Sequence, residues 1–147
     1  MRARSGSNPR ALAAAALAAS LFAMPALAET DQLGAAWDAA GLAYEGVLTN
    51  AEAAKLNVVA YHAAVAGLCE GFTLDARQVA DVTGAILDAG PADATQEALL
   101  NRQVDIMLTL GTAKGLFLAE GALHRERFCA QAKETRDEPD FDDLWTD

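Results

Sequence analysis

Apolar residues recur at the three- and four-residue intervals of an α-helix along most of the chain, and no long segment alternates apolar and polar residues. The clearest series begins near Thr30 and runs through Leu33, Trp37, Ala40, Tyr44 and Val47. Thr49 and Glu52 then form a capping box, which predicts a second helix from there to about Cys69. The sequence therefore predicts an all-α fold.

A third helix is expected over residues 74–89. Gly71 ends the second helix, and Thr73 is the expected N-cap of the third. Gly90 and Pro91 follow that helix and cannot continue it, so its end is well defined.

The last helical pattern opens at Asp93 or Thr95 and continues to about Lys133. A straight helix of that length would span ~60 Å, about twice the diameter of a small domain. Gly111 and Gly115 lie in the middle of the pattern. We therefore expect a break there, with a close contact between helices at the two glycines.

The expected small bundle of four to five helices covers residues 29–136 and contains the only two cysteines, Cys69 and Cys129. Neither cysteine belongs to a Cys-x-x-Cys pair or lies at a helix N-terminus, so nothing favours a reactive thiolate. In an exported domain of this size, two such cysteines indicate one disulfide.

The N-terminal segment, residues 1–28, has the composition of a secretory signal peptide. Three arginines precede an apolar run over residues 11–23, and small residues at 26–28 suit a cleavage site before Glu29. The run is shorter than the ~20 residues of a membrane span, which disfavours an uncleaved anchor. No later segment is expected to span a membrane, because the best candidate, residues 106–119, contains Lys114. We expect a periplasmic or secreted protein.

The net charge of the chain limits which classes of molecule it is expected to bind. The formal net charge of the whole chain is −10, and the segment before Glu29 holds three arginines and no acid. The rest of the chain holds eight basic and 21 acidic side chains, so its formal net charge is −13. A polyanion repels phosphate backbones and anionic lipid, so we expect neither nucleic-acid binding nor electrostatic membrane binding.

Enzymatic chemistry is not favoured, and no catalytic residue is predicted. Every serine lies before the predicted cleavage site, which removes serine hydrolases, and no glycine-rich phosphate loop is present. Glu45 and Glu70 are the only carboxylates beside apolar helix ends, where burial could create a general acid. Surface acids of an acidic protein are normally solvated, which favours a non-enzymatic protein.

A metal or cofactor is not expected either. His62 and His124 together with the two cysteines formally make four zinc ligands. The spacings are seven residues from His62 to Cys69 and five from His124 to Cys129, and neither matches a short zinc-ligand pair. A cofactor attached through a Cys-x-x-Cys-His motif is excluded because the motif is absent.

The tail over residues 137–147 contains six acids and three large apolar residues, namely Phe141, Leu144 and Trp145. Their spacing would place all three on one face of a helical turn, for which Asp140 after Pro139 is a suitable N-cap. The tail is either a solvated terminus or a docking segment that contacts its own bundle or another protein.

Cys69, Glu70 and Phe72 after a helix, with a second cysteine far downstream, resemble the small periplasmic acid-stress chaperones of the HdeA type. This resemblance implies a helical, exported protein with one disulfide that protects other proteins in acid. Those chaperones are rich in lysine, whereas this chain is rich in alanine and strongly acidic.

Three functional hypotheses follow. The first is a non-enzymatic exported module that binds another protein. The second is an acid-activated chaperone, because below about pH 3 the charge would change from −13 toward about +10 and loosen the fold. The third is a toxin-neutralising or enzyme-inhibiting protein, whose acidic surface would suit a basic target.

Overall fold

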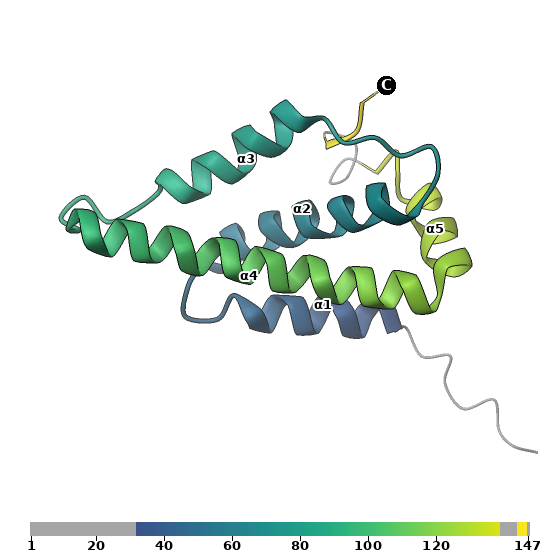
Figure 1. Ribbon diagram of the computed structural model, residues 1–147, viewed down its shortest axis with the longest axis horizontal. Helices are drawn as coiled ribbons and strands as arrows, with labels where there is room; N and C mark the ends of the chain where they lie inside the picture. Colours follow the sequence, from purple (N-terminus) through teal and green to yellow (C-terminus); the bar gives the residue numbers. More distant parts are fainter. Residues whose placement is uncertain (1–31, 139–143, 147) are drawn as a thin grey trace, which may run out of the picture. The chain divides into compact units, whose positions relative to one another are not determined.

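The computed structural model describes residues 32–138 and 144–146, so the predicted signal peptide and Phe141 lie outside the described residues. The part described confirms a small all-α fold with one disulfide. Five helices follow one another along it: α1 Gln32–Ala43, α2 Asn50–Leu68, α3 Ala76–Asp88, α4 Gln96–Leu123 and α5 Arg125–Glu134 (Figure 1).

Helix α2 is the central helix. The predicted capping box is present: the Thr49 hydroxyl accepts from the Glu52 backbone N–H, and the Glu52 carboxylate accepts from the Thr49 N–H at 2.8 Å. Beyond this first turn, α2 is buried against α1 on one side and α4 on another. Four of its apolar core residues are fully inaccessible to solvent, namely Leu56, Ala60, Ala64 and Val65.

An aromatic cluster joins four of the helices. Phe117 of α4 packs edge-on against Trp37 of α1, with ring centroids 4.9 Å apart, and against Tyr61 of α2 at 5.6 Å. Tyr61 in turn contacts Phe128 of α5 at 5.6 Å. Such edge-to-face pairs add to the stabilisation from burial itself, so this cluster is the centre of the core.

The prediction for the start of α3 was wrong by two residues. Asp75, not Thr73, is the N-cap, and its Oδ1 accepts from the backbone N–H groups of Arg77 and Gln78. The residues just before it are extended, and Leu74 forms an isolated antiparallel bridge with Trp145.

The predicted break at Gly111 and Gly115 was also wrong, because α4 runs unbroken over 28 residues and ends only at His124. A helical glycine costs about 1 kcal/mol, which burial of the inner face of α4 more than offsets. Both glycines are exposed, and a Cβ added at either would meet nothing within 4 Å. The close contact lies at Gly121, where a Cβ would stand 2.5 Å from Leu68 Cδ1.

Two glycines of α4 should therefore respond in opposite ways to the same substitution. Gly121→Val should lower the free energy of unfolding by about 1–3 kcal/mol, because the added methyl groups overpack the core. Gly115→Val is the matched control and should change it by less than about 0.5 kcal/mol. Urea unfolding followed by circular dichroism measures both, and equal effects would contradict the assignment of the contact.

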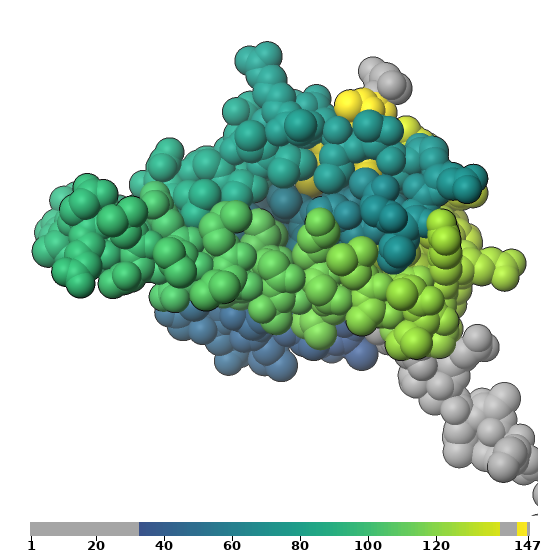
Figure 2. Space-filling model, in the orientation of Figure 1, coloured from purple at the N-terminus to yellow at the C-terminus, as the bar shows by residue number. Residues whose placement is uncertain are grey.

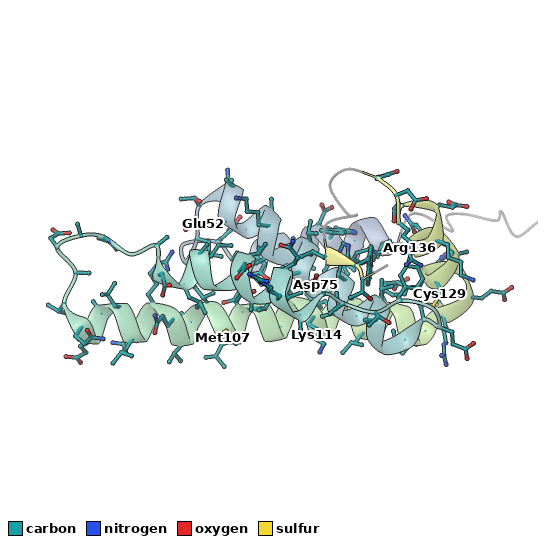
Figure 3. The ribbon with its side chains drawn as sticks, turned by 90° about the horizontal axis from the view of Figure 1, so that it is seen from above. Glu52, Asp75, Met107, Lys114, Cys129 and Arg136 are labelled. Atoms are coloured by element: carbon teal, nitrogen blue, oxygen red, sulfur yellow. A yellow bond between two sulfur atoms is a disulfide. The ribbon has the colours of Figure 1, made fainter. Side chains whose placement is uncertain are left out.

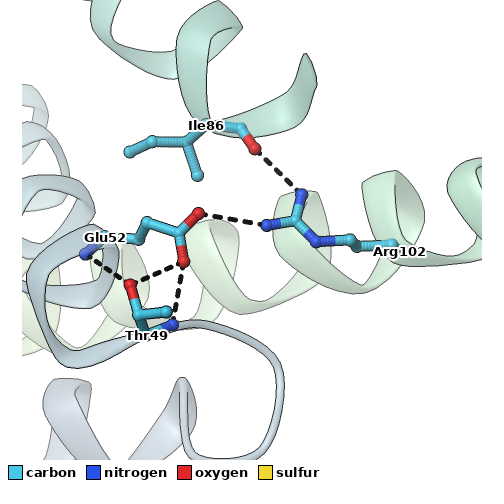
Figure 4. A network of polar contacts seen from close by, with 4 residues as sticks. All are labelled: Thr49, Glu52, Ile86 and Arg102. Atoms are coloured by element: carbon cyan, nitrogen blue, oxygen red, sulfur yellow. Dashed lines mark hydrogen bonds and ion pairs between the residues drawn. The ribbon is translucent and has the colours of Figure 1, made fainter. Parts of the chain in front are cut away.

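A polar network ties α2, α3 and α4 together (Figure 4). The Arg102 guanidinium of α4 donates to the Ile86 carbonyl of α3 at 2.9 Å and pairs with Glu52 Oε1 of α2 at 3.2 Å. Hydrogen bonds from the Thr49 backbone and hydroxyl, with the nearby Arg102 charge, hold the pKa of Glu52 below its ordinary value. Ionised Glu52 therefore stabilises the fold above its ordinary pKa, and this contribution is lost as pH falls through the lowered value.

Arg102→Met should lower the free energy of unfolding by about 1–2 kcal/mol at pH 7, because both hydrogen bonds are lost. The loss should shrink as pH falls below the lowered pKa of Glu52, because a protonated Glu52 no longer pairs with the arginine. Urea unfolding at pH 7 and at an acidic pH below the lowered pKa of Glu52 tests this. Arg77→Met, at an exposed position of α3, is the control and should have little effect at either pH.

Candidate functional site

The predicted disulfide is present. Cys69 lies at the C-cap of α2 and Cys129 lies in α5, with Cα atoms 5.5 Å apart. The bond closes a loop across a sequence separation of 60 residues. It indicates an oxidising environment and makes both sulfurs unavailable as nucleophiles or metal ligands.

The described end of the tail packs on its own bundle beside the disulfide-bonded end of α2. Leu144 is buried, its carbonyl accepts from the Asp75 N–H at 2.9 Å, and the Thr146 N–H donates to the Thr73 carbonyl at 2.9 Å. Backbone hydrogen bonds on both sides of Trp145 hold this end of the chain in place, whereas the predicted helical turn includes Phe141, which lies outside the described residues.

Trp145 lies over residues that the sequence did not connect to it. Its ring centroid is 4.3 Å from that of His62 and 5.0 Å from that of Phe72. His62 is fully buried, with Nδ1 2.8 Å from the Val58 carbonyl. Arg136 completes these surroundings: its Cζ lies 5.3 Å from the centroid of the Phe72 ring, and its guanidinium donates to the Gly71 carbonyl. We call His62, Phe72 and Arg136 the tail seat. Whether Phe141, Leu144 and Trp145 also contact a partner stays a prediction.

The other predicted candidates are not brought together. Glu45 and Glu70 are both exposed, so neither lies in the apolar surroundings that the sequence suggested. His124 separates α4 from α5 and lies 4.0 Å from Glu120. Within the described residues, no group of three or more His, Cys, Asp or Glu side chains could hold a metal ion.

The buried tyrosines are not poised for acid–base chemistry. Burial raises the pKa of Tyr44 to about 12 and also raises the pKa of Tyr61. Both phenols therefore stay protonated at physiological pH, and both belong to the core rather than to a cleft.

An apolar groove, which the sequence did not predict, lies between α3 and α4 with α2 as its floor (Figure 2). Its volume is about 550 Å³, within the ~300–1,000 Å³ range of small-molecule sites. The lining consists of small and apolar side chains except for one threonine and one lysine: Val59, Ala60, Ala63, Leu74, Ala76, Val79, Ala80, Thr83, Met107, Leu110, Gly111 and Lys114.

Hydrogen bonds hold α3 at both ends of the groove, which lies beside Ala76, Val79, Ala80 and Thr83 of this helix. Ile86 near the C-terminal end is buried and receives the Arg102 hydrogen bond. At the other end, Asp75 is hydrogen-bonded to Leu144 of the tail. Between these anchors the facing side chains on α2 and α3 are mostly alanines, too short to fill the gap.

Among the residues that the structure describes, Lys114 is the only charged one that lines the groove. It is exposed, lies on α4 on the same strip as Met107 (Figure 3), and makes no ion pair or hydrogen bond within the described part of the chain. The Thr83 hydroxyl oxygen of α3 is buried in the opposite wall, also without a hydrogen-bond partner among the described residues.

A second apolar surface lies on the outer face of α4. Leu100, Val104, Met107 and Leu108 form one stripe at helical spacing and are between 51% and 66% exposed. We call these four residues the α4 stripe. A surface helix normally presents polar residues to solvent. Helix α4 instead is apolar on two faces, and only one of them packs in the core.

Helix α4 also has the length and apolar composition that a membrane span would need, and 28% of the relevant window is buried in the bundle. Its inner residues Ile106, Ala113 and Phe117 are fully buried against the other helices.

Comparison with known proteins finds no matching family model, no similar curated protein and no similar solved structure. Function therefore has to be inferred from the chain's own surfaces.

Proposed function

We propose that this protein is an exported, non-enzymatic module that binds another protein through the α4 stripe. The observation that carries the proposal is the exposure of four large apolar residues in one row on a charged domain. Contiguous exposed apolar surface on a soluble domain marks an interaction site more often than scattered apolar residues do.

Charge defines the kind of partner. Exposed Glu97 and Asp105 lie beside the α4 stripe, and the chain from Glu29 onward carries a formal charge of −13. A second copy of the chain would be repelled. The matching partner is a protein with an apolar patch surrounded by basic residues, which would also gain a faster association rate from the opposite charge.

Export is supported by two independent features. The disulfide needs an oxidising compartment, and the segment before Glu29 has the order of a signal peptide. We propose cleavage before Glu29 and release into the periplasm or the medium.

Site-specific photo-crosslinking in the native host tests the proposed surface. A photoreactive side chain at Val104 should give one discrete adduct in the periplasmic fraction or medium. The same probe at Leu123, which is 76% exposed on the same helix but outside the α4 stripe, should give none. Leu108→Glu should abolish the Val104 adduct without changing the circular dichroism spectrum.

The adduct also separates the functional hypotheses. A basic toxin or enzyme as the captured protein would identify an inhibitor. Many different adducts that form only below pH 3 would identify the acid-activated chaperone. No adduct at Val104, or equal adducts at both positions, would overturn the proposal.

A further inference from the structure

We propose a second binding site, which adjoins the α4 stripe at Met107: the groove between α3 and α4 binds a free long-chain carboxylate, with its alkyl chain inside the groove and its carboxylate at Lys114. The ligand class follows from the shape of the groove, its lining and its single charge.

The lining selects an alkyl chain. It is formed largely by methyl and methylene groups from three helices and Leu74, and alanines of α2 and α3 lie across the groove from Met107, Leu110 and Gly111 of α4. Open apolar surface of this kind gains from every methylene that it removes from water. Few polar groups are available to orient a sugar, nucleotide or peptide ligand, which would leave its own hydrogen-bonding groups unpaired.

Lys114 selects an anionic head. Within the described part of the chain, its ammonium group is the one positive charge in the lining and has no ion-pair partner. It lies one helical turn beyond Gly111 on α4, so its long side chain can remain hydrated while its stem covers the edge of the groove. In a domain with a charge of −13, this local cation provides the attraction that an anionic ligand needs.

The same charge argues for a free fatty acid rather than a lipid in a membrane. Lipid headgroups at an anionic bilayer surface would meet a strongly acidic protein, and repulsion would keep the groove away from the surface. A free monocarboxylate in solution carries one charge, which Lys114 can neutralise.

Calorimetric titration of the mature protein tests the proposed site for the alkyl chain. The ligands are octanoate, decanoate, dodecanoate and tetradecanoate, each below its critical micelle concentration. Affinity should rise roughly threefold to fourfold per methylene until the groove is full. Dodecanol, which has the chain without the charge, should bind about fivefold more weakly than dodecanoate. Vesicles of phosphatidylglycerol should not co-sediment with the protein.

Three variants locate the ligand. Lys114→Gln should weaken dodecanoate about fivefold and leave dodecanol unchanged. Gly111→Leu should fill the groove and weaken both ligands more than about tenfold. Gly115→Leu is its matched control, because a Cβ there also meets open space but outside the groove, and it should change neither.

Thr83→Val distinguishes an alkyl chain from a polar ligand. The variant removes the unpartnered hydroxyl in the wall and keeps its shape, so it should bind dodecanoate more tightly. Weaker binding would overturn the ligand class. No saturable heat with any chain length, or equal loss in Gly111→Leu and Gly115→Leu, would overturn the site. Lys114→Gln and Thr83→Val change no residue of the α4 stripe, so their outcome is separate from that for the protein-binding surface.

Discussion

Replacing Cys69 and Cys129 together by alanine should lower the free energy of unfolding by about 4 kcal/mol. The expected size follows from releasing a loop of about 60 residues in the unfolded chain. Because the net stability of a domain is typically ~5–15 kcal/mol, the disulfide accounts for a large share of it. Cys69 is buried in the core, so its removal adds a small packing loss.

Urea unfolding with and without reductant provides the control. Reductant should destabilise the original protein to nearly the level of the double variant and should not affect the double variant. Original protein with the same midpoint in both buffers would contradict a stabilising role for the bond. The single variant Cys129→Ala should resemble the reduced protein if its free thiol is kept reduced.

Local signals in the sequence were sufficient to predict most helices. Thr49 with Glu52, and Thr95 before α4, are capping signals that act within three residues, and both have the predicted hydrogen bonds. The disulfide was predictable because only one pairing of two cysteines exists. The caps depend only on residues close by in the sequence, and the disulfide depends only on the number of cysteines.

Features that depend on distant partners were not predictable. The pattern at Gly111 and Gly115 looked like a close helix contact, but the contact occurs at Gly121 because Leu68 and Phe128 lie there. His62 and Trp145 are 83 positions apart in the sequence, and nothing local connects them. The groove is a further example, because it arises from short side chains facing each other across helices that only the fold brings together.

Trp145→Ala should lower the free energy of unfolding by about 2–3 kcal/mol. Complete loss of a buried tryptophan costs ~3–5 kcal/mol, and Trp145 is only half-buried at the end of the chain. The indole N–H has no acceptor among the described residues, so the loss comes from packing on His62 and Phe72. Thr146→Ala is the control and should cost less than about 1 kcal/mol, since its backbone pairing remains and only the exposed hydroxyl hydrogen bond to the Thr73 carbonyl is lost.

Fluorescence tests the same contact directly. In a Trp37→Phe background, Trp145 is the only tryptophan, and its emission should be blue-shifted in the native state and move to longer wavelength on unfolding. Native emission already typical of water would show that the tail is not seated, whatever the stability.

Loss of Trp145 should also loosen α3, because the tail anchors that helix. The Asp75 N–H donates to Leu144 at the N-terminal end of α3, whereas the C-terminal end is held by Arg102 and does not depend on the tail. In Trp145→Ala, backbone hydrogen exchange in α3 should therefore accelerate most in the first turn and least at Ile86. In α2, exchange should accelerate by little more than the global loss of stability explains. Uniform acceleration along α3 would show that the tail stabilises the whole domain without anchoring this wall of the groove.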